Sequence, residues 1–169
     1  NITLNPTDKP VSLTIEKDTR FTSSINNTVY TYVTNENVTV TRTAADTYIF
    51  NDLEIIEGTI LNKVYQVNGA DKTQRFIIPN SDIDISTLSV VVQKSSNDSE
   101  VYTFSDGNSI DVTTIKGTDR VYFLQEVEDG KYEITFGDGT IGRTLTDGNI
   151  VFLEYILTNG AAGNFASTF

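Results

Sequence analysis

Acidic side chains gather in the second half of the chain, where paired carboxylates could act as acid and base. The group comprises Glu126, Glu128, Asp129, Glu133 and Asp138. Most glycoside hydrolases use two such carboxylates on either side of the bond that they cleave. The strand pattern puts Glu126 and Glu133 on an exposed face, and the chain has no Trp to stack against a sugar. We therefore interpret these acidic residues as solvated turn residues. Among our three hypotheses for the function, a carboxylate-dependent enzyme ranks third.

The composition also limits other catalytic and metal-binding chemistry. The chain has no His and no Cys, so it contains neither a Ser-His-Asp nor a Cys-His arrangement. Residues 82–86 begin like an EF-hand loop, but Thr87 and Gln93 stand where that loop needs Gly and Glu. We expect no enzyme activity, no metal and no cofactor.

A dense run of glycines follows the acidic group. Residues 137–142 match the phosphate-binding pattern G-x-G-x-x-G, but the following residues are too few and too turn-like to open a helix. Asp138 would also repel a phosphate, so we interpret the run as a tight connection between two strands, at 131–136 and 149–157. The structural motif that we assign here comprises Phe136, Gly137, Asp138, Gly139, Gly142, Gly148 and Asn164.

The charge balance indicates which partners to expect. Acidic residues outnumber basic ones by 23 to 12, for a net charge of −11. Such a field repels nucleic acid and anionic membranes, and no apolar run is long enough to span a bilayer. We expect no nucleic acid, no membrane and no small-molecule substrate. Because the chain lacks Met and begins at Asn1, we expect it to be a fragment of a longer protein.

Four side chains are candidates for an interface with another protein. Arg120 and Arg143 flank the predicted hairpin of an acidic chain, and Arg can form bidentate pairs with carboxylates. Intrachain salt bridges explain these two residues equally well. Tyr30 and Tyr32 alternate along one strand, which a single strand face also explains.

Alternating apolar and polar residues dominate the elements that would position these groups. The alternation covers residues 11–15, 29–33 and 38–41, and no apolar stripe has the helical period. We predict a mainly β fold (β-rich α+β with at most short helices) built from antiparallel sheets. One helical turn is expected at Ser81, and Val90–Val92 suggests a strand buried on both faces.

A hairpin is the most specific local prediction. Asp129-Gly130 is typical of a two-residue type I′ turn between strands at 121–128 and 131–136. A plain two-residue turn opposes Glu128 with Lys131 and therefore pairs Phe123 with Phe136. That register places Phe123, Gln125 and Val127 on the buried face. It also places Glu126 opposite Glu133 on the exposed face.

The order and spacing of several motifs resemble those of the baseplate J-like proteins of contractile phage tails, nearest to the wedge subunits of T4-like phages. The matching residues are 121–126, 130–134, 136–139, Gly142, Arg143, Gly148, Tyr155 and 160–164, with 55–58, 76–80 and 84–88 upstream. Arg143 stands where many members carry Lys, and residues 144–146 lack a proline that is common after it.

This resemblance implies a late structural protein of the virion, a baseplate wedge component assembled in the host cytoplasm. It would contact copies of itself and neighbouring wedge proteins and transmit the sheath-contraction signal. The resemblance also implies an outer β-domain at 1–59 and 160–169, with an inserted β-rich domain at 60–159. A receptor-binding or adhesin-like β-module is the alternative, and a contractile injection system is left open as the particle.

Overall fold

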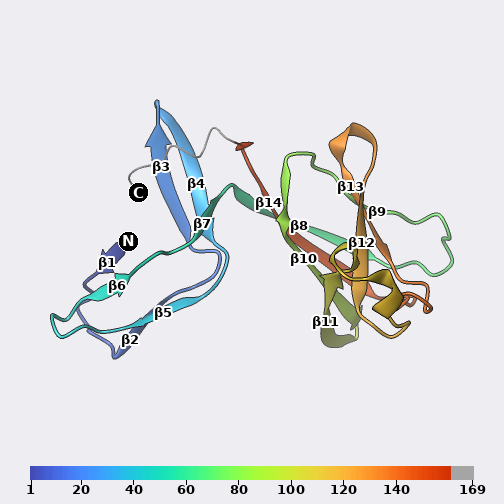
Figure 1. Cartoon of the computed structure of the whole chain (residues 1–169), viewed down its shortest axis with the longest axis horizontal. Helices are drawn as coiled ribbons and strands as arrows, with labels where there is room; N and C mark the ends of the chain where they lie inside the picture. The colour runs from blue at the N-terminus through green and yellow to red at the C-terminus, as the bar shows by residue number, and fades with distance from the viewer. Residues whose placement is uncertain (161–169) are drawn as a thin grey trace. The chain divides into compact units, whose positions relative to one another are not determined.

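The structure is a computed structural model that describes residues 1–160 (Figure 1). These residues form fourteen strands and three short 3₁₀ turns, which confirms the mainly β fold. The helical turn expected at Ser81 is wrong, because this residue lies in a bend that leads directly into a strand at Ile83. The chain divides into two compact units, one formed by Asn1–Ile60 with the segment that begins at Thr158, the other by Leu61–Leu157.

The first unit consists of three small sheets. Its strands are β1 (Ile2–Leu4), β2 (Ser12–Ile15), β3 (Arg20–Ile25), β4 (Thr28–Thr34), β5 (Val38–Thr41), β6 (Tyr48–Phe50) and β7 (Ile55–Glu57). They pair as β1–β6, β2–β5 and β3–β4–β7, and every pair is antiparallel. Ile15, Tyr48 and Phe50 form the buried centre, and partly buried apolar residues such as Phe21 and Val38 pack against it.

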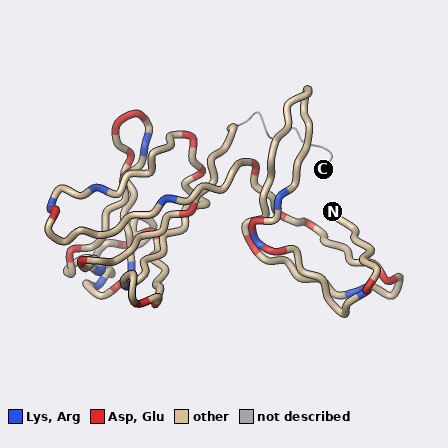
Figure 2. Tube along the Cα trace, turned by 180° about the vertical axis from the view of Figure 1, so that it is seen from behind, with Lys and Arg blue, Asp and Glu red and all other residues tan. Residues whose placement is uncertain are grey.

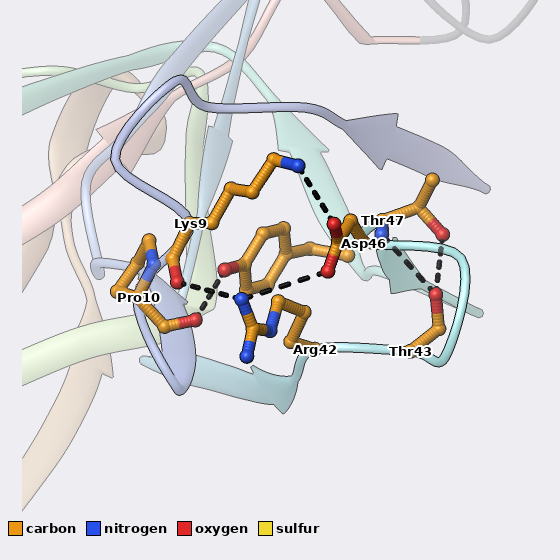
Figure 3. A network of polar contacts seen from close by, with 7 residues as sticks. Lys9, Pro10, Arg42, Thr43, Asp46 and Thr47 are labelled. Atoms are coloured by element: carbon orange, nitrogen blue, oxygen red, sulfur yellow. Dashed lines mark hydrogen bonds and ion pairs between the residues drawn. The ribbon is translucent and has the colours of Figure 1, made fainter.

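A polar network closes the β5–β6 turn over this centre (Figure 3). Lys9 Nζ donates to Asp46 Oδ2 at 2.7 Å, and Arg42 Nη1 donates to the Lys9 carbonyl at 3.2 Å. The buried Tyr48 hydroxyl donates to the Pro10 carbonyl. The hydrogen bond from Lys9 lowers the pKa of Asp46. These contacts fasten the segment before β2 to the turn before β6.

The second unit is one seven-stranded sheet. Its strands are β8 (Thr59–Gln66), β9 (Phe76–Ile78), β10 (Ile83–Ser95), β11 (Asp98–Asp106), β12 (Val121–Glu126), β13 (Tyr132–Phe136) and β14 (Ile150–Leu157), in the order β8-β14-β10-β11-β12-β13-β9. Its 3₁₀ turns are η1 (Gly107–Ser109), η2 (Val112–Thr114) and η3 (Glu128–Gly130). The Tyr65 hydroxyl on β8 donates to the Ile77 carbonyl on β9, so the two ends of the strand order meet in a near-barrel.

One pair in this sheet departs from the antiparallel arrangement. β11 and β12 are parallel, with Ser105 opposite Val121 and Asp106 opposite Tyr122. Parallel neighbours need a long crossover, and residues 107–120 with their two 3₁₀ turns supply it. The two strands run in the same direction, but only the end of β11 lies beside the start of β12.

The core of this unit lies on the inner face of the near-barrel sheet. Its buried residues include Val90, Val92, Phe104, Ile134 and Leu153. Edge-to-face ring contacts at 5.4–5.5 Å link Tyr65, Phe76, Phe136 and Phe104 in succession. The expectation of a strand buried on both faces holds only in part, because Val91 between the two buried valines is half-buried.

The predicted hairpin forms, but its register is shifted by one residue. Asp129 and Gly130 both have positive φ, as the predicted turn requires. However, the Val127 amide donates to the Lys131 carbonyl, and the Lys131 amide donates to the Glu128 carbonyl. Val127 and Glu128 therefore both lie opposite Lys131, which makes a β-bulge.

The bulge changes which side chains share a face. Tyr122 now lies opposite Phe136, and Leu124 lies opposite Ile134. Tyr122 and Leu124 contribute to the core in place of Phe123 and Gln125. The predicted register and the predicted Glu126–Glu133 pair are therefore wrong.

Candidate functional site

The glycine motif folds into a loop that is held by hydrogen bonds to the side chain of Asp138, its one acidic residue. Asp138 Oδ1 accepts hydrogen bonds from the amides of Thr140 at 2.8 Å and Ile141 at 3.0 Å. The Ile141 and Thr140 amides lower the pKa of Asp138. Gly139 N donates to the Gly142 carbonyl at 3.0 Å and closes the loop. Asp138 thus has a structural role in the turn.

This loop docks on the segment that leads into β12. Gly142 N donates to the Lys116 carbonyl at 3.2 Å, and Arg143 N donates to the Asp119 carbonyl at 2.7 Å. A Cβ added at Gly117 would lie 1.8 Å from the Gly139 carbonyl oxygen. The two loops therefore approach so closely that only glycine fits at this contact.

Docking brings the two candidate interface arginines onto one tyrosine. The Arg120 guanidinium carbon lies 3.8 Å from the centre of the Tyr102 ring, and that of Arg143 lies 5.6 Å from it. Both arginines are exposed, and Tyr102 on β11 is half-buried. We call these three residues the arginine clamp. Within residues 1–160, neither guanidinium forms an ion pair with a carboxylate, so the intrachain salt bridges that the sequence left open are not formed there.

Two hollows flank Arg143. One of about 140 Å³ is lined by residues such as Lys94, Phe104 and Leu145. The other, of about 490 Å³, is open and also borders Arg120. Lys94 itself is neutralised by Asp98 at 2.7 Å and by a longer contact to Glu100. A hydrogen bond to Glu100 raises the pKa of Tyr102.

The acidic group does not assemble into a carboxylate pair for catalysis. Arg75 binds Glu133 through two hydrogen bonds, Nε to Oε1 at 2.9 Å and Nη2 to Oε2 at 2.6 Å. This contact lowers the pKa of Glu133. Glu128 and Asp129 lie in the β12–β13 turn, which is mostly red in Figure 2. The Asp129 side chain is 82% exposed and has a 3.5 Å contact to Lys131.

The remaining predicted residues lie at other places. Gly148 has a φ of 81° and donates to the Val67 carbonyl at 3.0 Å. Tyr30 is half-buried, and Tyr32 is only 6% exposed, which leaves it no surface for a partner in this conformation. Burial raises the pKa of Tyr32, and the charge of Glu57 adds to this effect. Asn164 lies outside the described residues, as does most of the expected return at 160–169.

Two buried polar residues were missed by the sequence analysis. Glu57 accepts from the Asn159 amide at 2.9 Å and from Asn159 Nδ2 at 2.7 Å, which joins the end of β7 to the returning segment. Asn149 accepts from the Thr146 amide at 2.8 Å and donates to the Lys94 carbonyl at 2.8 Å. The only sequence signal for Asn149 is its place between a turn glycine and an apolar strand.

Two further classes of site are not found in the described part of the chain. Residues 1–160 contain no group of three or more acidic, His or Cys side chains placed to hold a metal ion. No helix in the same range is long and apolar enough to cross a membrane.

Comparison with known families gives a match in the N-terminal part of the chain. Residues 1–58 match the family model described as "Baseplate wedge protein gp6, domain II". No curated protein matches the chain. This match agrees with the expected resemblance to baseplate wedge proteins over the N-terminal segment. The resemblance of residues 121–164 lies beyond the match and stays a prediction.

Proposed function

We propose that this chain is a structural component of the baseplate wedge of a contractile phage tail, that it makes subunit contacts during assembly and that it transmits the sheath-contraction signal. The observation that carries the proposal is the match of residues 1–58 to domain II of a baseplate wedge protein. The role is non-enzymatic, as expected for a family of structural baseplate proteins.

The two expected domains have different tasks in this proposal. The outer domain, at 1–59 and 160–169, contains the residues that match the family and makes the contacts within the baseplate wedge. The inserted domain, at 60–159, presents loops whose backbone is fixed by hydrogen bonds between the glycine motif and residues 116–119. A signal that is transmitted mechanically needs such stiff surfaces, because a loose loop would absorb the displacement.

The partners in this proposal are copies of the chain and neighbouring wedge proteins, which meet in the host cytoplasm. A fixed copy number per particle follows from this role. A receptor-binding or adhesin-like module would instead occur with fibres at the particle surface.

The test is quantitative mass spectrometry of purified tails from the source. Trypsin releases residues 21–42 from the first unit and residues 121–131 from the second, because each peptide lies between basic residues. We expect equal amounts of both peptides. The copy number per particle should be a multiple of six, because the resemblance implies a sixfold baseplate. Absence from tails, or recovery only in a trimeric fibre fraction, would refute the wedge assignment and favour the adhesin alternative.

A further inference from the structure

We propose that the arginine clamp binds the acidic β12–β13 turn of a second copy of this chain in a head-to-tail contact. We call Glu126, Glu128 and Asp129 the acidic tip. The inference rests on the self-association in the proposed function and specifies which residues meet. It is carried by two features of one unit. One is a pair of arginines that form no ion pair with a carboxylate within residues 1–160, and the other is a group of exposed carboxylates at the opposite end of β12.

The clamp has unused binding capacity. Arg120 and Arg143 form no carboxylate pair within residues 1–160, although the whole chain has 23 acidic residues. A guanidinium that contacts an aromatic ring face retains N–H groups for hydrogen bonds to a carboxylate. Such charge-assisted bonds are shorter and stronger than neutral ones.

The clamp is also anchored before any partner arrives. The Arg120 carbonyl accepts from Ser105 N at 2.9 Å, and Arg143 N is bonded to the Asp119 carbonyl. Tyr102 lies on β11, the strand parallel to β12. A partner therefore meets side chains whose backbones are fixed, which reduces the entropy lost on binding.

The acidic tip has the complementary charge and exposure. It carries three carboxylates, and the only cation that pairs with the tip in residues 1–160 is Lys131, at 3.5 Å from Asp129. The positive φ of Asp129 belongs to the fixed turn, so the tip projects as a defined loop. Arg75 binds Glu133 at the same hairpin, which raises the pKa of Arg75, and the charge of Glu128 adds to this effect. Within residues 1–160, however, Arg75 forms no ion pair with the tip.

The two patches are too far apart to satisfy each other within one copy. Arg120 directly precedes β12, and Glu128 and Asp129 follow its other end. At about 3.3 Å per residue, the six residues of β12 separate them by about 20 Å. This exceeds the Debye length of about 10 Å at 0.1 M salt, so neither patch neutralises the other within one copy and both are accessible to a second molecule.

The geometry predicts the type of assembly. Two unlike patches on one molecule make a heterologous contact, which gives a ring when the rotation closes and a filament when it does not. The same patches predict weaker association at high salt. The net charge of −11 makes nucleic acid a poor competitor for the clamp.

The test uses sedimentation velocity of the whole chain over a concentration series at low and high salt. We expect the wild type to associate at low salt and to dissociate at high salt. R120Q/R143Q and E126Q/E128Q/D129N should each raise the dissociation constant by about tenfold or more. The control K17Q/K72Q removes two exposed charges outside both patches and should associate like the wild type. Circular dichroism melts establish that each variant is folded.

Mixing the two variants gives the sharpest result. The clamp variant keeps its tip and the tip variant keeps its clamp, so the mixture should form a one-to-one dimer and nothing larger. A wild type that stays monomeric at low salt, or a mixture that does not pair, would overturn the contact. Tails that contain the chain while this test fails would leave the wedge role intact and remove only the clamp–tip contact.

Discussion

Replacing Gly137 by Ala tests whether the glycine motif is required by close packing. The added Cβ would lie 2.1 Å from the Gly142 carbonyl carbon, 2.2 Å from its oxygen and 2.4 Å from the Ile141 oxygen. All three atoms belong to the backbone, so no side-chain rotation relieves the contact. The loop must move away from residues 116–119, to which it is bonded.

The expected cost combines two effects. Forcing an extra methyl into a packed site costs about 1–3 kcal/mol. Displacing the loop also weakens the bonds from Gly142 N to Lys116 and from Arg143 N to Asp119, at about 0.5–1.5 kcal/mol each. We therefore expect Gly137→Ala to lower the free energy of unfolding of the second unit by about 2–6 kcal/mol.

Gly148→Ala is the matched control, because the two glycines differ in what they require. Gly148 has a φ of 81° but nothing within 4 Å of an added Cβ. Its replacement should cost only the left-handed backbone penalty of about 1–2 kcal/mol.

Urea unfolding monitored by circular dichroism measures the loss in the free energy of unfolding. Circular dichroism is used because the chain has no Trp for fluorescence. Hydrogen exchange assigns the loss to one unit, and the Gly142 amide should lose protection in Gly137→Ala alone. If Gly137→Ala costs no more than Gly148→Ala, the close approach of the two loops is not what requires the glycine.

Three further substitutions follow from the contacts. Ile134→Ala removes a fully buried core side chain and should destabilise the second unit by about 2–5 kcal/mol in urea, whereas a loss below about 1 kcal/mol would contradict the packing. Tyr48→Phe removes the hydrogen bond to Pro10 and should cost about 0.5–1.5 kcal/mol in the first unit, measured by hydrogen exchange. Arg75→Gln should lower the free energy of unfolding only slightly at neutral pH, because Arg75 is largely exposed and water screens its ion pair with Glu133. Because the folded pKa of Glu133 is lowered, this difference should be full above its unfolded pKa of about 4.3 and should vanish as the pH falls through the folded pKa; a difference that persists in acid would refute the ion pair.

The hairpin shows how far local sequence reasoning reaches. Asp129-Gly130 adopts the positive φ values expected from its residue types, since that preference depends on the two residues themselves. The bulge at Val127 and Glu128 was not predictable from the turn. It turns Tyr122 and Leu124 toward the core, and a one-residue shift moves every side chain of a strand to the other face.

The candidate site shows the same division. Arg120 and Arg143 were singled out from their residue type and the acidity of the chain, but no local pattern connects them to Tyr102. Their meeting depends on the parallel pairing of β11 with β12 and on the docking of the glycine loop. The role of Glu57 was missed for the same reason, because its partner Asn159 is distant in the chain.

Residue types and their local pattern were enough to predict the β content, the Asp129-Gly130 turn and the lack of His and Cys chemistry. Strand and turn preferences act within a few residues, so alternation at 38–41 or a Gly at 130 can be interpreted without knowing the fold. The register of the hairpin could be seen only in the folded chain, as could the parallel strand pair and the arginine clamp. Each of these depends on packing and hydrogen bonds between segments far apart in the chain, and such contacts leave no periodic pattern in either segment.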